Sequence, residues 1–143
     1  MRDETEALIE RYYAAFNNAD WEGMLSLLSE DVRHDINQST SQTGKEAFRA
    51  FMGEMDRCYK ERLDNIVILS DATGTRAAAE YVVHGEYLTA AEDLPPAHGQ
   101  KYILPGGAFF SITNGKITRV SNYYNLQDWL DQVAKTQRDA RAG

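Results

Sequence analysis

The chain has 143 residues, of which 43% are hydrophobic and 26% charged, and its formal net charge at pH 7 is −7. This composition is globular, and the length suits one domain with a single hydrophobic core. The acidic balance disfavours nucleic acid and anionic membranes as partners, because both would need clustered lysine and arginine side chains. With Cys58 as its one cysteine, the sequence offers neither a disulfide framework nor a cysteine-based metal site.

The sequence also lacks the pattern of a membrane or export segment. No apolar run approaches the roughly 20 residues of a membrane-spanning helix. The first twenty residues are polar and have helical spacing, which is not the pattern of a signal peptide. We therefore expect a cytoplasmic protein without a membrane partner.

Two helices are predicted at the start of the chain. Between residues 4 and 17, apolar side chains recur at three- and four-residue spacing, which places them on one helical face. Asp20 is a suitable N-cap for a second helix over residues 21–29. Two helices joined this tightly form a hairpin that covers another part of the domain.

A short strand and a third helix follow. Residues 32–37 are too few and too mixed in polarity for a helix, so we predict a strand. Thr43 and Glu46 have the spacing of a capping box, which predicts a helix that starts at Gly44. The apolar stripe of this helix belongs either to the core or to the wall of an apolar cavity. It consists of Ala47, Phe48, Phe51, Met52, Met55 and Tyr59.

After residue 60 the hydrophobic period changes from about 3.6 to 2, which indicates strands. The predicted strands are residues 63–70, 76–88, 100–113 and 116–124. The tripeptide Pro105-Gly106-Gly107 predicts a bend or bulge, and Asn114-Gly115 predicts a hairpin turn. A last helix is expected over residues 126–137, followed by a short flexible tail over residues 138–143.

These elements predict one α+β domain over residues 1–143, with its core at about residues 5–135. No repeat or linker divides the chain. A meander of long antiparallel strands twists and curls, and helices on its concave side would leave a cone that holds a pocket. The fold therefore suits a protein that encloses a small molecule.

Several short motifs follow one another in an order that is typical of a known superfamily. They are Arg11-Tyr12-Tyr13-Ala14-Ala15-Phe16-Asn17, Asp20-Trp21-Glu22-Gly23, residues 27–35, Thr43-Gly44-Lys45-Glu46-Ala47, Leu94-Pro95-Pro96 with Gly99, Gly115-Lys116-Ile117, and Tyr123-Tyr124-Asn125. Their order and spacing resemble the NTF2-like superfamily, and within it the ketosteroid isomerase and SnoaL-like polyketide cyclase branch. The resemblance implies a cystatin-like α+β roll, with a curved antiparallel or mixed sheet and N-terminal helices packed on its concave face.

The resemblance also implies positions for functional residues. Ketosteroid isomerases use a tyrosine of the first helix as an oxyanion-hole donor, and Tyr12 falls on that position. Their proton-shuttling aspartate falls at Ile36 without a gap, and a slip of one residue brings Asp35 onto it. Their second oxyanion donor is a protonated aspartic acid. That position falls at Gly107 or Ala108, so the carboxyl is absent here.

His34 and Asp35 are the candidate general bases, and the strand period leaves two alternatives open. Because side chains alternate, His34 shares one face with Ile36, and Asp35 shares the other with Asn37. In the gapless register His34 points into the cone, and an imidazole that titrates near neutral pH suits a base. If a bulge shifts the register, Asp35 is the base and His34 faces the far side.

Other polar and aromatic side chains are candidates for the cavity wall. Asn122 shares a face with Tyr124, as Tyr81 does with Tyr87, and all four would donate hydrogen bonds to a carbonyl or enolate oxygen. Alternatively, some of them lie on the outer face of the sheet. The predicted wall consists of Phe51, Met55, Tyr59, Tyr81, Tyr87 and Tyr124.

Together these features predict a cofactor-independent isomerase or cyclase. It would remove a proton next to a carbonyl of a small hydrophobic molecule, with His34 or Asp35 as the base and Tyr12 and Asn122 as donors to the enolate oxygen. The alternative is a non-catalytic protein of the same fold that binds a small ligand or serves as a dimeric accessory module.

The histidines give no sign of a metal site, because His34, His84 and His98 do not have the spacing of metal ligands. The sequence also lacks a phosphate-binding loop and a dinucleotide fingerprint, so no cofactor is expected. The resemblance implies a homodimer formed through the outer face of the sheet.

Overall fold

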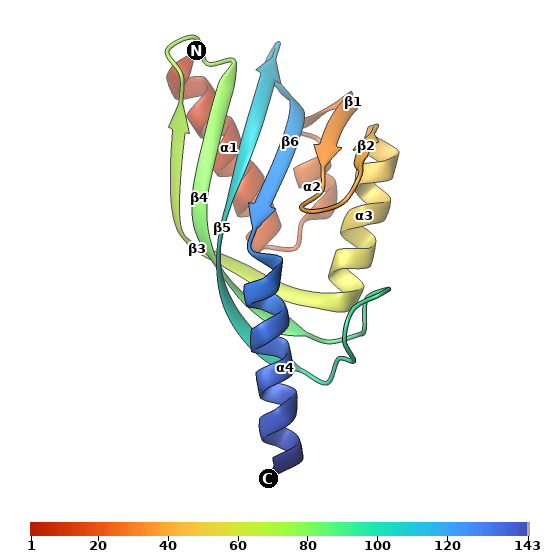
Figure 1. Ribbon diagram of the computed structural model, residues 1–143. Coiled ribbons are helices and arrows are strands. Elements are labelled where there is room, and N and C mark those ends of the chain that lie inside the picture. The colour runs from red at the N-terminus through yellow and green to blue at the C-terminus, as the bar shows by residue number, and fades with distance from the viewer. Residues whose placement is uncertain (143) are drawn as a thin grey trace.

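The computed structural model describes the backbone of residues 1–142 and the side chains of residues 1–134. Helices and strands alternate only at the start of the chain, and a meander of four long strands precedes the last helix (Figure 1). The elements are α1 (Arg2–Asn17), α2 (Trp21–Leu25), β1 (Leu28–Asp35), β2 (Ser41–Thr43), α3 (Lys45–Cys58), β3 (Tyr59–Ser70), β4 (Arg76–Tyr87), β5 (Gln100–Thr113), β6 (Lys116–Tyr124) and α4 (Leu126–Ala142).

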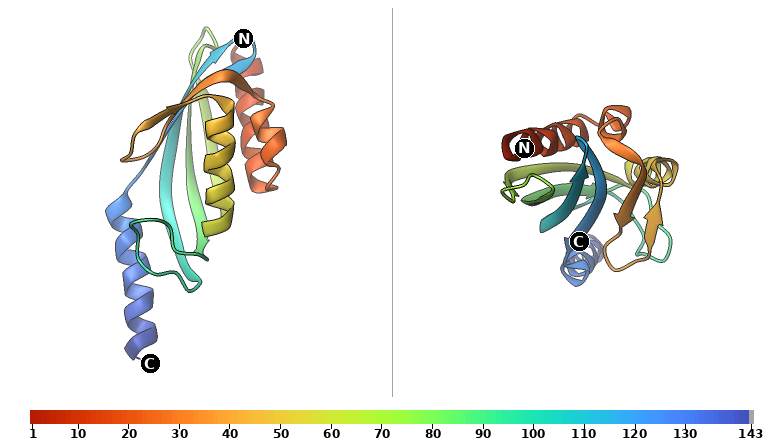
Figure 2. Two further views of the ribbon diagram at one scale, coloured as in Figure 1. Left: turned by 90° about the vertical axis from the view of Figure 1, so that its right-hand side faces the viewer. Right: turned by 90° about the horizontal axis from the view of Figure 1, so that it is seen from above.

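The strands form one six-stranded sheet in the order β2-β1-β6-β5-β4-β3. β1 runs parallel to β6, and all other neighbours are antiparallel. The sheet curves, and α1 and α3 lie on the same, concave side (Figures 1 and 2). The predicted fold class, an α+β domain with a curved mixed sheet and helices on its concave face, is therefore confirmed.

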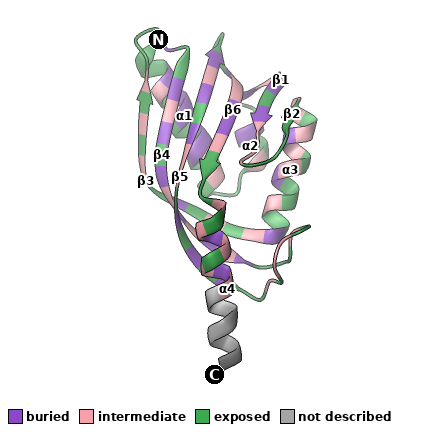
Figure 3. Cartoon of the chain, viewed as in Figure 1, coloured by how far each residue is buried: buried purple, intermediate pink, exposed green. Residues whose placement is uncertain are grey.

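The concave face of the sheet carries the core. Along β4 the inner positions are buried and alternate with outer ones, as the strand period requires (Figure 3). The rings of Tyr12 and Tyr13 on α1 meet Phe110 of β5 edge to face, with ring centres 5.5 and 6.1 Å apart. Tyr13 also lies 5.6 Å from the ring of Tyr81 on β4. Aromatic pairs of this kind add about 0.5–1.5 kcal/mol each to the effect of burial.

Several boundaries near β1 differ from the sequence-based prediction, and β1 itself covers Leu28–Asp35 rather than residues 32–37. α2 ends at Leu25 rather than at residue 29, because β1 starts at Leu28 and pairs with Ile117 of β6. The capping box before α3 is not formed. Thr43 belongs to β2, and Gly44 is the N-cap with a φ of 106° and no side-chain hydrogen bond. Pairing in the sheet thus overrides the local helix signals.

The later strands also differ in detail. β3 starts at Tyr59, four residues before the predicted start, because its ladder with β4 continues to Tyr87. The predicted bulge around Gly106 is absent from the pairing of β4 with β5, and the register shift lies between Ser111 and Ile112 in the pairing of β5 with β6. The backbone of the predicted tail belongs to α4 up to Ala142, and its side chains and Gly143 lie outside the described residues.

The exposed edge of β5 is covered by α4. β6 ends opposite Gly106, so the earlier part of β5 has no strand on that side. There the side-chain amide of Gln132 accepts a hydrogen bond from the Ile103 N–H (2.9 Å) and donates one to its carbonyl oxygen (2.8 Å). An amide that imitates a strand in this way blocks pairing with another chain at this residue. None of the helices described by the structure is long and apolar enough to cross a membrane.

A second side-chain amide ties α1 to the sheet. The last residue of α1, Asn17, donates from Nδ2 to the carbonyl oxygen of Leu63 (3.0 Å) and accepts at Oδ1 from the Leu63 N–H (2.8 Å). These bonds lie just before the irregularity in the β3–β4 ladder between Asp64 and Val67. Asn17 therefore satisfies backbone groups at the point where the strand bends.

We expect Asn17→Ala to lower the free energy of unfolding by about 1–3 kcal/mol, because it leaves two partly buried backbone groups of Leu63 without partners. Chemical denaturation measures the change. Asn18→Ala is the matched control, since Asn18 is exposed. An equal effect of the two substitutions would contradict the assigned role.

Candidate active site

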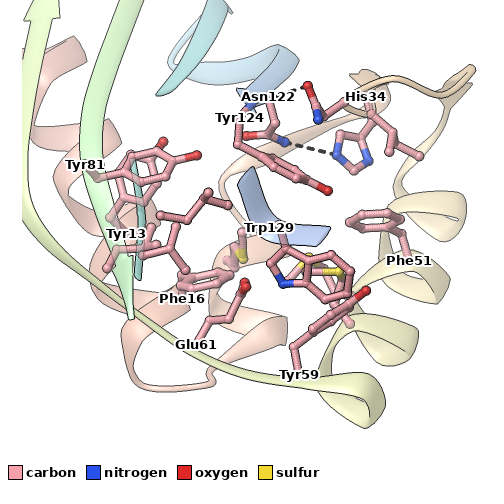
Figure 4. A pocket seen from close by; sticks show the side chains of 18 of the residues that line it. Tyr13, Phe16, His34, Phe51, Tyr59, Glu61, Tyr81, Asn122, Tyr124 and Trp129 are labelled. Carbon is pink, nitrogen blue, oxygen red and sulfur yellow. Dashed lines mark hydrogen bonds between the residues drawn. The ribbon is translucent and has the colours of Figure 1, made fainter. Parts of the chain in front are cut away.

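A cavity of about 150 Å³ lies between the concave face of the sheet, α1, α3 and the start of α4. Its walls are mostly apolar, with a few polar side chains (Figure 4). His34 and Asn122 lie at one end of the view, Tyr13 and Tyr81 at the other, and the Glu61 carboxyl points into the space between them (Figure 4). The predicted site residues that line it are Tyr12, His34, Phe51, Met55, Tyr59, Tyr81, Asn122 and Tyr124.

His34 is held firmly in the cavity wall. Its ring is 2% exposed and lies 4.4 Å from the ring of Phe48 and 4.7 Å from that of Phe51, both on α3. Its Nε2 is 3.3 Å from Nδ2 of Asn122, which projects from the neighbouring strand β6 (Figure 4). The aromatic rings and the amide thus fix the plane of the imidazole.

The environment of His34 keeps its ring neutral. Burial lowers the pKa of the imidazole to about 4, and the neighbouring Asp35 carboxylate opposes that shift only in part. At pH 7 the ring therefore has one nitrogen with a lone pair and one with a proton. Nδ1 is buried and has no hydrogen-bond partner among the described residues.

Asp35 does not reach the cavity. Its carboxylate accepts hydrogen bonds from Arg33 Nε (2.8 Å) and Ser41 Oγ (2.5 Å) at Oδ1, and from Ser121 Oγ (2.5 Å) at Oδ2. The ladder of β1 with β2 and β6 has no shift across residues 33–35, so Asp35 faces away from His34. Of the two alternatives left open by the sequence, the structure shows the one with His34 in the pocket.

The partners of Asp35 keep it ionised. Burial alone would raise the pKa of the carboxyl, but the hydrogen bonds from Ser121, Ser41 and Arg33 outweigh that effect and hold the pKa well below its usual range. The carboxylate therefore ties β1 to β2 and β6, and it is occupied with this structural role.

The hydroxyl groups of the α1 tyrosines stay protonated. Burial raises the pKa of both Tyr12 and Tyr13 well above the ordinary value, and it raises that of Tyr81 to about 12. The Tyr13 hydroxyl is buried and has no hydrogen-bond partner among the residues that the structure describes. These phenols are suited to donate hydrogen bonds to an oxygen of a bound molecule.

Tyr87, which was expected in the cavity wall, belongs to the core instead. Its hydroxyl donates to the carbonyl oxygen of Pro95 (2.6 Å) and accepts from the Ala91 N–H (3.0 Å). It shares the inner face of β4 with Tyr81 but lies further along the strand, where it holds the loop before β5. His84 lies on the outer face of β4, with Nε2 3.8 Å from the Asp64 carboxylate.

Two polar cavity residues were missed by the sequence analysis. Glu61 lines the cavity and accepts a hydrogen bond from the Tyr102 hydroxyl at Oε2 (2.5 Å). Its position two residues before Leu63 on the inner face would have revealed it, had β3 been predicted to start at Tyr59. Asn37, which the strand period placed on the face of Asp35, lines the cavity instead, because β1 ends at Asp35; its Nδ2 is buried and has no hydrogen-bond partner in the part of the chain that the structure describes. Among the described residues, no three His, Cys, Asp or Glu side chains converge as metal ligands would.

Comparison with protein families and solved structures gives a consistent result. The family model for the SnoaL-like domain matches residues 9–120. A provisionally assigned polyketide cyclase from Pseudomonas putida KT2440 is 59% identical, and the match covers 90% of this chain and 97% of that one with a TM-score of 0.90. A second provisional polyketide cyclase, from Xanthomonas campestris pv. campestris, is 52% identical over 92% of this chain and 98% of that one, also with a TM-score of 0.90.

More distant matches extend the picture. A provisionally assigned ketosteroid isomerase from Kribbella flavida DSM 17836 is 25% identical, with a TM-score of 0.64 over 87% of this chain and 79% of that one. The curated relatives are protein translocase subunits SecA of Nitratidesulfovibrio vulgaris, 27% identical over 114 residues, or 78% of this chain. This chain spans only about 13% of their length. The solved structures support an NTF2-like fold of the isomerase or cyclase type.

We expect Asp35→Asn to destabilise the protein by about 1.5–3 kcal/mol at neutral pH, because it weakens three hydrogen bonds to a charged acceptor. The folded-state pKa of Asp35 is lowered, so its contribution is present above the unfolded-state pKa of about 4 and is lost as the pH falls below it. Denaturation at pH 7 and pH 3 measures both effects. Asp31→Asn is the exposed control. A pH-independent difference between wild type and Asp35→Asn would contradict this account.

Proposed function

This chain belongs to the SnoaL-like domain family, and from that premise we propose that it is a cofactor-independent enzyme of the isomerase or cyclase type. Its first step would be removal of a proton from a carbon atom next to a carbonyl group. Isomerisation of an unsaturated ketone and ring closure by carbon–carbon bond formation share this step, since both start from an enolate. The observation that carries the proposal is the neutral, buried His34 in the wall of an apolar cavity.

His34 would act as the base. Its Nε2 lone pair takes the proton from carbon, and the C–H electron pair moves through the carbon–carbon bond onto the carbonyl oxygen. In the resting protein Nε2 lies 3.3 Å from the Asn122 amide, a contact loose enough to be exchanged for one with substrate. The Asn122 amide and the hydroxyl of Tyr12 would then donate to the enolate oxygen.

The size of the cavity limits the substrate. A cavity of about 150 Å³ with apolar walls has room for a molecule of about one aromatic ring. The polar side chains are few, so the substrate would be a small, largely apolar ketone rather than an anion or a sugar. Because the pKa of His34 is about 4, its activity as a base would be constant above about pH 6 and would fall as the ring is protonated near pH 4.

Indan-2-one is a suitable probe, because it has one aromatic ring and activated protons next to its carbonyl. We expect the protein to accelerate deuterium incorporation from D₂O into the methylene groups of this ketone, measured by NMR. His34→Gln keeps the size and one polar contact but removes the base, and should slow the catalysed exchange by about 10²–10⁴-fold. His84→Gln, on the outer face, is the matched control and should exchange as the wild type does.

The same samples distinguish the enzyme from a binding protein. If indan-2-one binds, as seen in the protein's own NMR spectrum, and the wild type does not accelerate its exchange, the alternative of a non-catalytic ligand-binding protein is favoured. If His34→Gln retains the wild-type rate, His34 is not the base.

We further propose that the protein forms a homodimer through the outer face of the sheet. The outer-face patch consists of Val67, Leu69, Ile103, Phe109 and Tyr123, which are 49–63% exposed. Phe109 and Tyr123 lie edge to face with ring centres 5.7 Å apart, and Phe109 is paired with Ala78 on β4. Exposed apolar side chains on several strands of one face favour association with a second copy of the same face.

We expect the wild type to have about twice its chain mass of 16.1 kDa in size-exclusion chromatography with light scattering. Phe109→Asp places a charge in the centre of the patch and should give the monomer mass with an unchanged circular dichroism spectrum. Leu88→Asp, at an exposed apolar position outside the patch, is the control. A monomeric wild type, or dissociation of both variants alike, would contradict the proposed interface.

A further inference from the structure

A row of three residues crosses the sheet beside the cavity. In the ladders, Glu61 of β3 is paired with Gly85 of β4, and Gly85 is paired with Tyr102 of β5. Glu61 and Tyr102 are thus separated by one whole strand, or about 9.5 Å of sheet. Even so, the Tyr102 hydroxyl donates a hydrogen bond to Glu61 Oε2 at 2.5 Å. The tyrosine ring reaches over β4 to make this contact.

Gly85 makes the contact possible. A Cβ atom added at Gly85 would lie 2.3 Å from Cζ and 2.5 Å from the hydroxyl oxygen of Tyr102, well inside van der Waals distance. Any other residue at this position would push the ring away. The Tyr102 ring also contacts Trp129 of α4 edge to face, with ring centres 5.9 Å apart at an angle of 78°. The row therefore fixes the position of the Glu61 carboxyl, whereas a glutamate side chain without these contacts would be free to rotate.

The second oxygen of Glu61 is available to a ligand. Oε1 has no hydrogen-bond partner among the residues described by the structure, and the side chain points into the cavity that His34 also lines (Figure 4). Glu61 and His34 lie on different sides of this cavity (Figure 4). Glu61 also lines a neighbouring surface groove, through which its carboxyl can exchange protons with water.

We propose that Glu61 is a ligand-binding carboxylic acid, which donates a hydrogen bond from its protonated carboxyl to an oxygen atom of the bound molecule. Tyr102 is its positioning residue. This role of Glu61 rests on the proposed function, because Glu61 lines the same cavity. It adds a second requirement that the substrate must meet. The molecule must present an uncharged oxygen acceptor, such as a carbonyl, on the side of the cavity where Glu61 lies.

The surroundings of Glu61 favour its protonated form. Burial raises the pKa of the carboxyl, and the hydrogen bond from Tyr102 offsets only part of that effect. The titratable groups that interact with it are phenols: Tyr59 on β3, Tyr81 on β4, Tyr102 on β5 and Tyr124 on β6. Burial raises the pKa of all four, so they are uncharged. Its charged neighbours are Asp56 and Lys60, which share the surface groove.

The test compares two ligands that differ in one atom group. Indan-2-one carries one oxygen acceptor, which in the binding mode under test lies at Glu61 rather than at Asn122 and Tyr12, and 2-methyleneindane has a CH₂ group in its place. Their dissociation constants are measured by NMR titration between pH 5.5 and pH 9, with no need for turnover. We expect indan-2-one to bind about tenfold or more weakly once Glu61 is ionised, and 2-methyleneindane to show no such change.

Variants identify the group responsible. Glu61→Gln keeps the shape and a donor but cannot ionise, so it should bind indan-2-one equally at all pH values. Glu86→Gln, on the outer face of β4, is the matched control and should retain the wild-type pH dependence. In Tyr102→Phe the ionised form loses its hydrogen bond, so the Glu61 carboxyl signal in ¹³C NMR should titrate at a higher pH than in the wild type.

The proposal is overturned if both ligands have the same pH profile, if Glu61→Gln retains the pH dependence, or if indan-2-one does not bind. A Glu61 carboxyl that titrates at or below the ordinary value of about 4.3 overturns it as well. If Glu61→Gln fails to fold, the titration of the Glu61 carboxyl in the wild type and in Tyr102→Phe still tests the proposal. Loss of deuterium exchange in His34→Gln tests the base separately, so failure of one idea leaves the other intact.

Discussion

The parallel pairing of β1 with β6 is the constraint on which the site depends. It fixes which face of β1 meets the cavity, and a shift of one residue would exchange His34 for Asp35. The Asp35 carboxylate secures this register, since it accepts hydrogen bonds from Ser41 on β2 and Ser121 on β6. Asp35, which the family resemblance offers as a base, thus has a structural role. It holds the strand in the position in which the imidazole faces the ligand space.

Removal from water then determines the charge state of the groups inside. Burial lowers the pKa of His34 to about 4, so its ring is uncharged at neutral pH, and it raises the pKa of Glu61, which favours the protonated carboxyl. One becomes a group with a free lone pair and the other a group with a proton to donate. Pairs of titratable groups whose pKa values are shifted in opposite directions by their environment are characteristic of acid–base sites. An apolar cavity achieves this without a metal ion or a second charge, because desolvation acts on acids and bases in opposite senses.

The sequence predicted the fold well, because helix and strand periods are local properties that the sheet reinforces. The errors of the prediction lie where pairing between strands, rather than the local sequence, determines where an element begins. The capping signal of Thr43 was overridden by its place in β2, and β3 extends back to Tyr59 because β4 offers it a partner. That extension is the reason why Glu61 was missed. The face of Tyr87 was predicted, but not its depth along the strand, since a period of two says which side a residue faces and not whether a loop covers it.

Several buried polar atoms without a hydrogen-bond partner lie around the cavity. A buried donor or acceptor without a partner costs about 1–3 kcal/mol, so cores normally avoid them. Among the described side chains there are five such atoms, and those of Tyr13, His34 and Asn37 belong to residues that line one cavity. Apolar residues at these positions would make the fold more stable. Their concentration around a single cavity agrees with the proposed binding of a molecule that has an oxygen acceptor.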